Sequence, residues 1–186
     1  MNIGANLKAE GATNVDFDEL YKGLKAVLTG EQTEISNREC AELLNKYFTE
    51  LEENKMKAAM EEGKAFLAAN AVRPEVTTLP SGLQYEVIKA GTGDKPKATS
   101  TVRCHYHGTF IDGRVFDSSV QRGEPADFPV NGVIAGWVEA LQLMPVGSKW
   151  KLYIPYNLGY GARGAGQSIP PYSTLIFEVE LLEILK

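Results

Sequence analysis

Cysteine, long apolar runs and blocks of like charge are all scarce in this sequence. Its 186 residues contain two cysteines, Cys40 and Cys104, which are too few for a disulfide framework and are expected to be small buried side chains. No run approaches the ~18 uninterrupted apolar residues that a membrane-spanning helix requires. The N-terminal segment lacks the basic start and apolar block of an export signal. We therefore expect a soluble chain with no membrane partner, cytoplasmic, or periplasmic if an N-terminal signal was removed.

The charged side chains are numerous but evenly mixed. The chain has 19 basic and 24 acidic residues and a formal net charge of −5, with no block of either sign. Nucleic acids are bound by clustered Lys and Arg, so this composition argues against a nucleic-acid partner. Hydrophobic residues make up 44% of the chain, which excludes a disordered protein and suffices for at least one core.

Proline and glycine are distributed unevenly along the chain. None of the nine prolines precedes Pro74, and 13 of the 18 glycines also lie after residue 73. Helix interiors disfavour both residues, whereas turns between strands require them. The sequence therefore predicts an all-α region over residues 1–73, a linker over 74–81 and a strand-rich domain over 82–186.

Two helix starts are visible in the first region. Asp16 and Ser36 each stand three residues before a glutamate, which is the spacing of an N-cap and its capping-box partner. Apolar residues then recur every three or four positions, as far as Gly30 after the first start and about Asn70 after the second. At 1.5 Å per residue, the second helix would be ~50 Å long, which is more than a small domain can cover.

Residues 1–73 are too few to bury these apolar stripes by themselves. Three helical segments, of which the first resembles the end of a helix over 3–11, would form only a marginal isolated core. A symmetric homodimer made through residues 1–73 is therefore favoured over a monomeric helical bundle.

After Gly82 the apolar pattern changes to a period of two. Alternation is clear at 102–107, 150–154 and 175–181, and Asp112-Gly113 has the composition of a hairpin turn. Residues 133–143 have the apolar spacing of one short helix. Antiparallel strands with one short helix predict an α+β module.

Ordinary catalytic groups are rare in the second region. Its histidines, His105 and His107, share one strand face without a Cys, Asp or Glu at metal-ligand spacing, so we interpret them as a sheet-surface pair. The glycine-rich segment 159–166 is followed by no lysine and no helix that could bind a phosphate. We therefore expect neither a metal nor a cofactor.

Aromatic residues and prolines recur instead in several short strings. These are HYHG at 105–108, DGRVFDSS at 112–119, VIAGW at 133–137, YG at 160–161 and IPP at 169–171, followed by VEL at 179–181. In this order and spacing they resemble the FKBP family of peptidyl-prolyl cis-trans isomerases over about residues 82–186. Region 1–73 resembles the helical N-terminal dimerisation region of a bacterial branch, the macrophage infectivity potentiator-like isomerases, with the chain beginning inside its first helix.

The resemblance implies an antiparallel half-barrel wrapped around the short helix, with a shallow apolar pocket between them. It implies catalysis of X-Pro bond rotation in unfolded or partly folded polypeptides, without covalent or acid–base steps, and macrolide inhibitors as further ligands. The site residues that it implies are Tyr106, Phe116, Asp117, Phe128, Val133, Ile134, Trp137, Tyr160, Ile169 and Phe177. Trp137 would form the floor of the pocket. Ala126 and Ala165 stand where the family often has bulkier residues, so a wider rim is expected.

A different class of function stays open. The long helix over 36–70 also fits a dimeric chaperone or peptide clamp that holds unfolded clients by avidity, with isomerisation secondary.

Overall fold

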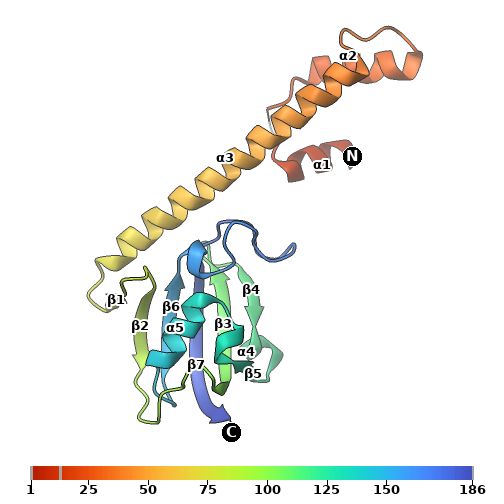
Figure 1. The fold of residues 1–186 in the computed structure, drawn as a ribbon. Helices are drawn as coiled ribbons and strands as arrows, with labels where there is room; N and C mark the ends of the chain where they lie inside the picture. The colour runs from red at the N-terminus through yellow and green to blue at the C-terminus, as the bar shows by residue number, and fades with distance from the viewer. Residues whose placement is uncertain (1, 13, 186) are drawn as a thin grey trace. The chain divides into compact units, whose positions relative to one another are not determined.

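The computed structural model describes residues 2–12 and 14–185 (Figure 1). The chain divides into two compact units, one up to Lys57 and one from Ala58 onward, which we call the helical unit and the sheet unit. The division falls within a long helix. The last part of that helix therefore belongs to the same unit as the sheet.

The helical unit contains α1 (Asn2–Glu10), α2 (Phe17–Thr29) and the first part of α3 (Asn37–Ala71). The carboxylate of Asp16 accepts the amide N–H groups of Asp18 and Glu19 at 3.0 and 3.1 Å, so it caps α2. Before α3, Ser36 and Glu39 exchange hydrogen bonds in a capping box. Both predicted helix starts are confirmed.

The apolar side chains of α2 remain largely exposed. No residue of α2 is buried within the chain. Six of its apolar side chains are between 41% and 78% exposed: Phe17, Leu20, Tyr21, Leu24, Val27 and Leu28. The apolar face of α2 is therefore not buried within the described part of the chain.

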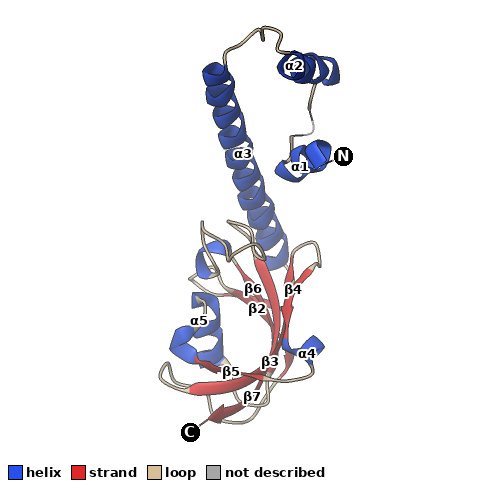
Figure 2. Cartoon of the chain, turned by 90° about the vertical axis from the view of Figure 1, so that its right-hand side faces the viewer, coloured by secondary structure: helices blue, strands red, loops and turns tan. Residues whose placement is uncertain are grey.

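The sheet unit is built on one antiparallel sheet. Its strands are β1 (Val76–Thr78), β2 (Gln84–Lys89), β3 (Thr101–Phe110), β4 (Val115–Ser118), β5 (Ala126–Pro129), β6 (Lys149–Ile154) and β7 (Leu175–Leu185). The order is β1-β2-β6-β7-β3-β4, with β5 also paired to β3. The unit also contains two short α-helices, α4 (Ser119–Arg122) and α5 (Ala135–Leu143), and two 3-10 helices, η1 (Val130–Gly132) and η2 (Tyr156–Leu158). The predicted α+β class is confirmed, and Figure 2 shows α5 against one face of the curved sheet.

The core lies between α5 and the facing side of the sheet. Strand β3 alternates strictly, with Val102 and Cys104 buried and the residues between them partly exposed. A Cβ at Gly136 of α5 would lie 2.8 Å from Cγ2 of Ile154. Glycine at this position therefore allows α5 to pack closely on β6.

The end of α3 covers part of the other sheet face. Tyr153 alternates with core-facing residues of β6, yet it is only 2% exposed, because Phe66 of α3 packs near it with ring centroids 6.0 Å apart. The buried amide of Asn70 donates to Gln84 Oε1 at 2.8 Å. Arg73 donates to the Tyr153 hydroxyl at 2.9 Å. Within the predicted linker 74–81, β1 pairs with β2, so this segment contributes to the sheet.

Candidate active site

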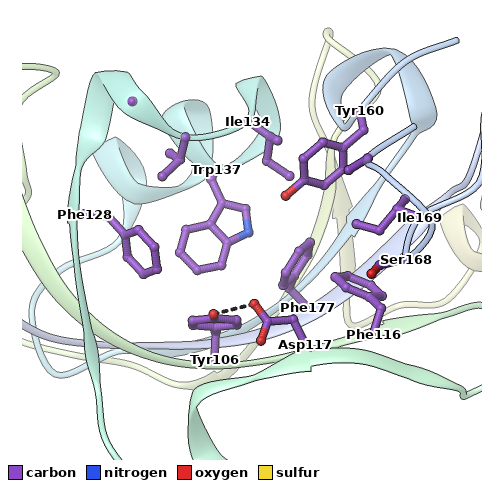
Figure 3. A pocket seen from close by; sticks show the side chains of 13 residues that line it. Tyr106, Phe116, Asp117, Phe128, Ile134, Trp137, Tyr160, Ser168, Ile169 and Phe177 are labelled. Carbon is purple, nitrogen blue, oxygen red and sulfur yellow. Dashed lines mark hydrogen bonds between the residues drawn. The ribbon is translucent and has the colours of Figure 1, made fainter. Parts of the chain in front are cut away.

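A cavity of about 730 Å³ opens between α5 and the sheet. Its lining contains all ten of the residues predicted from the sequence, together with Gly132, Ala165 and Ser168. Figure 3 shows aromatic side chains from separate elements pointing toward a common centre. The structure therefore brings the whole predicted set together, and it adds three small residues to it.

Five elements and two connecting segments supply the lining, and the segment between β5 and α5 contributes Gly132, Val133 and Ile134. Tyr106 comes from β3, Phe116 and Asp117 from β4, Phe128 from β5, Trp137 from α5 and Phe177 from β7, while Tyr160 and Ile169 come from the loop between β6 and β7. Neighbouring strands in the sheet place several of these positions side by side. Gly108 of β3, for example, pairs with both Asp117 and Phe177.

Aromatic rings form the floor and walls of the cavity. Trp137 is 4% exposed, and its ring meets those of Tyr106, Phe128 and Phe177 edge to face, with centroids 5.6, 5.5 and 5.3 Å apart. Such contacts add to the free energy gained by burying the rings. A Cβ at Gly108 would lie 2.7 Å from Phe116, so glycine makes room for that ring.

Asp117 is the charged residue of the lining, and its carboxylate is already engaged. The Tyr106 hydroxyl donates to Asp117 Oδ2 at 2.6 Å (Figure 3). Arg122 of α4 forms an ion pair with Asp117 and donates to the Tyr106 oxygen at 2.7 Å. Burial works to raise the pKa of Asp117, but the hydrogen bonds from Tyr106 and Arg122 outweigh it, so this pKa is lowered. Asp117 is therefore a carboxylate at neutral pH.

Sequence reasoning missed Arg122. The only available signal was its position, three residues after the string DGRVFDSS, in a segment with no regular pattern. Because α4 begins directly after β4, one short helical turn carries Arg122 back to Asp117.

Two further polar groups lie at the cavity. Burial, and then the charge of Asp117, raise the pKa of Tyr160, which keeps its phenol protonated as a donor. Ile134 is the N-cap of α5, and its amide N–H pairs with no acceptor among the described residues. Both groups could donate a hydrogen bond to a carbonyl in the cavity.

Other expectations for the second region concern the two histidines and the two alanines of the expected rim. His105 and His107 do not line it; their Nδ1 atoms lie 3.1 and 3.0 Å from the hydroxyls of Ser119 and Ser118. Ala165 lines the cavity as expected of a rim residue, but Ala126 does not and instead packs against the core.

Over residues 2–12 and 14–185, no group of three or more potential ligand side chains could hold a metal ion. No helix in the described part of the chain could cross a membrane.

Family profiles match both halves of the chain. The profile for the FKBP-type peptidyl-prolyl cis-trans isomerase matches residues 93–182. The profile for the domain amino terminal to FKBP-type peptidyl-prolyl isomerase matches residues 1–87. The FKBP-type 22 kDa peptidyl-prolyl cis-trans isomerase of Escherichia coli is 47% identical over 192 residues, covering 100% of this chain and 91% of the relative. This chain belongs to the FKBP-type peptidyl-prolyl cis-trans isomerases.

Two other relatives of this FKBP-type isomerase also cover all or nearly all of the chain. The protein named outer membrane protein MIP from Legionella longbeachae is 43% identical, covering 100% of this chain and 82% of the relative. The crystal structure of FkpA from Escherichia coli superposes with a TM-score of 0.82 at 35% identity, covering 98% of this chain and 89% of FkpA. The predicted family and activity are confirmed: this isomerase catalyses the cis–trans rotation of X-Pro bonds.

Proposed function

We propose that the cavity between α5 and the sheet is the active site, and that it accelerates rotation without transferring a proton. The observation that supports this is the nature of its lining. Aromatic and aliphatic side chains predominate, and the one carboxylate, Asp117, is held by Tyr106 and Arg122. An engaged, ionised carboxylate with a lowered pKa is poorly suited to act as a general acid.

The chemistry of the peptide bond makes such a site sufficient. Resonance places negative charge on the carbonyl oxygen and gives the C–N bond partial double-bond character, which creates a rotation barrier of ~18–20 kcal/mol. The two X-Pro isomers differ by only ~0.5–1 kcal/mol, so a catalyst only needs to lower the barrier. Each ~1.4 kcal/mol removed from it increases the rate tenfold.

An apolar cavity lowers this barrier by removing water from the amide. The planar ground state is charge-separated and loses favourable hydration there. The twisted transition state has less charge separation and is tolerated better. Desolvation thus acts in the direction that catalysis requires.

Each part of the lining has a proposed role in this scheme. The proline ring packs on Trp137, with walls from Tyr106, Phe128 and Phe177. The Ile134 amide and the Tyr160 hydroxyl donate to a substrate carbonyl. Asp117 orients Tyr106 through their 2.6 Å hydrogen bond. The remaining lining residues, Phe116, Val133 and Ile169, exclude water.

A prolyl isomerisation assay tests this assignment. Rates are measured on a series of X-Pro peptides, with and without tacrolimus. We expect catalysis across the series and competitive inhibition by the macrolide, because the substrate's proline ring and the macrolide would occupy the same cavity. Catalysis that persists unchanged with tacrolimus bound, or in a folded Trp137→Leu variant, would place the active site elsewhere.

We further propose that the isomerase is a homodimer formed through residues 1–73. The exposed apolar side chains of α2 support this, since an amphipathic helix of this kind normally buries its apolar face.

Two pockets in one dimer would also allow the second candidate function, a clamp that holds unfolded clients by avidity. Comparing the full chain with residues 58–186 on a short peptide and on a refolding protein separates the two. A clamp predicts that the full chain is superior only on the protein substrate.

The compartment remains a prediction. The sequence favours the cytoplasm, or the periplasm if an N-terminal signal was removed. One relative is named an outer membrane protein, which supports testing the periplasmic alternative. We propose to decide between the two compartments by fractionating cells that express the full-length gene, with cytoplasmic and periplasmic marker enzymes as controls.

A further inference from the structure

Strand β4 ends just before it would reach the main chain of Tyr106. On this edge of β3, Gly108 pairs with Asp117 and His107 with Ser118. The next pair would join Tyr106 to Ser119, but Ser119 is the first residue of α4. Strand β5 resumes pairing only at Cys104. The main chain of Tyr106 therefore lies in a gap between two strands.

The side chain of Ser119 fills this gap. Its hydroxyl oxygen accepts the Tyr106 amide N–H at 2.7 Å and lies 3.2 Å from the Tyr106 carbonyl oxygen. His105 Nδ1, at 3.1 Å, is the third group near this hydroxyl. Ser119 is fully buried, so bulk solvent does not reach its hydroxyl. Leaving the buried Tyr106 amide N–H without an acceptor would lower the stability of the fold, and we expect the main chain to shift so that the N–H finds another partner.

We propose that Ser119 is a positioning residue of the isomerase, whose hydroxyl substitutes for the missing strand partner and holds Tyr106 in place. This proposal rests on the assignment of the cavity as the active site. Ser119 does not line the cavity and would act only through Tyr106.

The position of Tyr106 affects much of the site. Its ring contacts those of Phe128, Trp137 and Phe177, and its hydroxyl reaches Asp117 at 2.6 Å. Small displacements of groups that orient a substrate reduce rates strongly. A shift of the Tyr106 main chain would move the ring and break its contact with Asp117 together.

The chain offers a matched control at Ser148. This serine is also fully buried, and its hydroxyl accepts a main-chain N–H, that of Gly91, at 3.0 Å. Neither Ser148 nor Gly91 lines the cavity. Replacing Ser148 by alanine therefore removes the same kind of hydrogen bond without affecting Tyr106.

The test compares Ser119→Ala and Ser148→Ala in the full chain. Tm is measured for each variant, and kcat and KM on an X-Pro peptide are measured well below both melting temperatures. We expect similar decreases in Tm, but a loss of at least about fivefold in kcat/KM for Ser119→Ala, mainly in kcat, and a change within about twofold for Ser148→Ala. Equal kcat/KM values for the two variants would overturn the proposal.

A double-mutant cycle tests whether Ser119 acts through Tyr106. In a Tyr106→Leu background, Ser119→Ala should change kcat/KM by less than about twofold, because there is no phenol left to position. The same fold loss in both backgrounds would contradict the proposed route. Should Ser119→Ala fail to fold, Ser119→Cys replaces it, since a thiol is a weak acceptor. A folded cysteine variant with wild-type kcat/KM would equally overturn the role of Ser119.

The outcome for Ser119 can be separated from that for the cavity. If tacrolimus competes with the peptide while Ser119→Ala stays fully active, only the role of Ser119 fails. If tacrolimus has no effect and a folded Trp137→Leu variant retains full activity, the cavity assignment itself fails.

Discussion

Apolar residues recur at regular spacing in both the helical unit and the sheet unit, but only the sheet unit buries most of them in a core. In the sheet unit, α5 covers the sheet, and a core forms in which Leu141, Leu152 and Val179 are fully buried. In the helical unit, α2 has an equally clear apolar face, yet Phe17 and Leu28 are 76% and 78% exposed. An amphipathic pattern therefore predicts that a face will be covered, but it does not specify what covers it.

Polar groups differ between the units in the same way. The sheet unit buries Asn70, Gln84 and Ser119, each with a hydrogen-bond partner. The helical unit has ion pairs between exposed side chains, such as Lys22 with Glu19, and these contribute little to stability. Specific packing is thus concentrated in the sheet unit, where the proposed active site also lies.

The largest effect should come from the floor of the cavity. Trp137→Ala should lower the free energy of unfolding by ~3–5 kcal/mol and remove most activity, because the same ring belongs to core and cavity. Trp137→Leu should recover part of the stability but not the activity. Tyr21→Ala, at an exposed ring of α2, is the control and should leave the sheet unit unchanged. Denaturant unfolding and isomerisation assays measure both quantities, and normal activity in folded Trp137→Ala would be incompatible with the proposed site.

Truncation should give the next effect. Residues 74–186 and residues 58–186 should both fold as active monomers, since all cavity residues lie within them. The shorter fragment should be less stable, by about 2 kcal/mol, because it loses the packing of Phe66 on Tyr153 and the hydrogen bond between Asn70 and Gln84. Thermal melts of the two fragments measure the difference. Equal melting temperatures would mean that the end of α3 does not contribute to the stability of the sheet unit.

Arg122 provides a test of the polar side of the cavity. Arg122→Ala should lower kcat/KM by about three- to tenfold, because Asp117 and Tyr106 lose their shared partner. Arg114→Ala is a suitable control, since Arg114 pairs with Asp112 in an exposed turn and does not line the cavity. An Arg122→Ala enzyme as active as Arg114→Ala would show that Asp117 needs no positioning.

A charge on α2 should affect assembly and leave catalysis unchanged. Leu24→Asp should convert a dimer of 20.3 kDa subunits into monomers, because it places a carboxylate on the apolar face. Lys25→Asp is the control on the neighbouring position. Light scattering gives the mass, and kcat/KM per subunit on a short peptide should stay within about twofold. A wild-type chain that is monomeric at micromolar concentration would refute the dimer.

The smallest effect is expected from pH. Asp117, with its lowered pKa, stays ionised above the ordinary Asp value of ~3.9, so its stabilising contribution is lost only as the pH falls below that value. Burial raises the pKa of Tyr106 and Tyr160, so both stay protonated beyond ~10. Measured kcat/KM should therefore be nearly flat from about pH 5.5 to 9. A step near neutral pH that disappears in a His105→Gln, His107→Gln double variant would instead indicate histidine catalysis.

Much of the fold was predictable because its signals are local. Asp16 and Ser36 cap the helices that their spacing indicates, and α3 ends within one residue of the predicted position. The cavity residues were predicted through a resemblance, since no periodicity distinguishes Phe128 or Tyr160 from ordinary core aromatics. Arg122 was missed because nothing in its surroundings marks an arginine that turns back toward a carboxylate five positions earlier.

The sequence alone determined the starts of α2 and α3, the end of α3, the separation of helical from strand-rich segments, and the family of the enzyme, because caps, periods and motif spacing depend on residues that are close together in the chain. Only the tertiary structure decided that α3 continues into the sheet unit, that β1 forms within the expected linker, and that Ser119 completes the edge of β3 at Tyr106. These features depend on contacts such as Arg73 with Tyr153, which are 80 residues apart. Such pairings become favourable only when the fold has removed both partners from water, so they leave no local pattern in the chain.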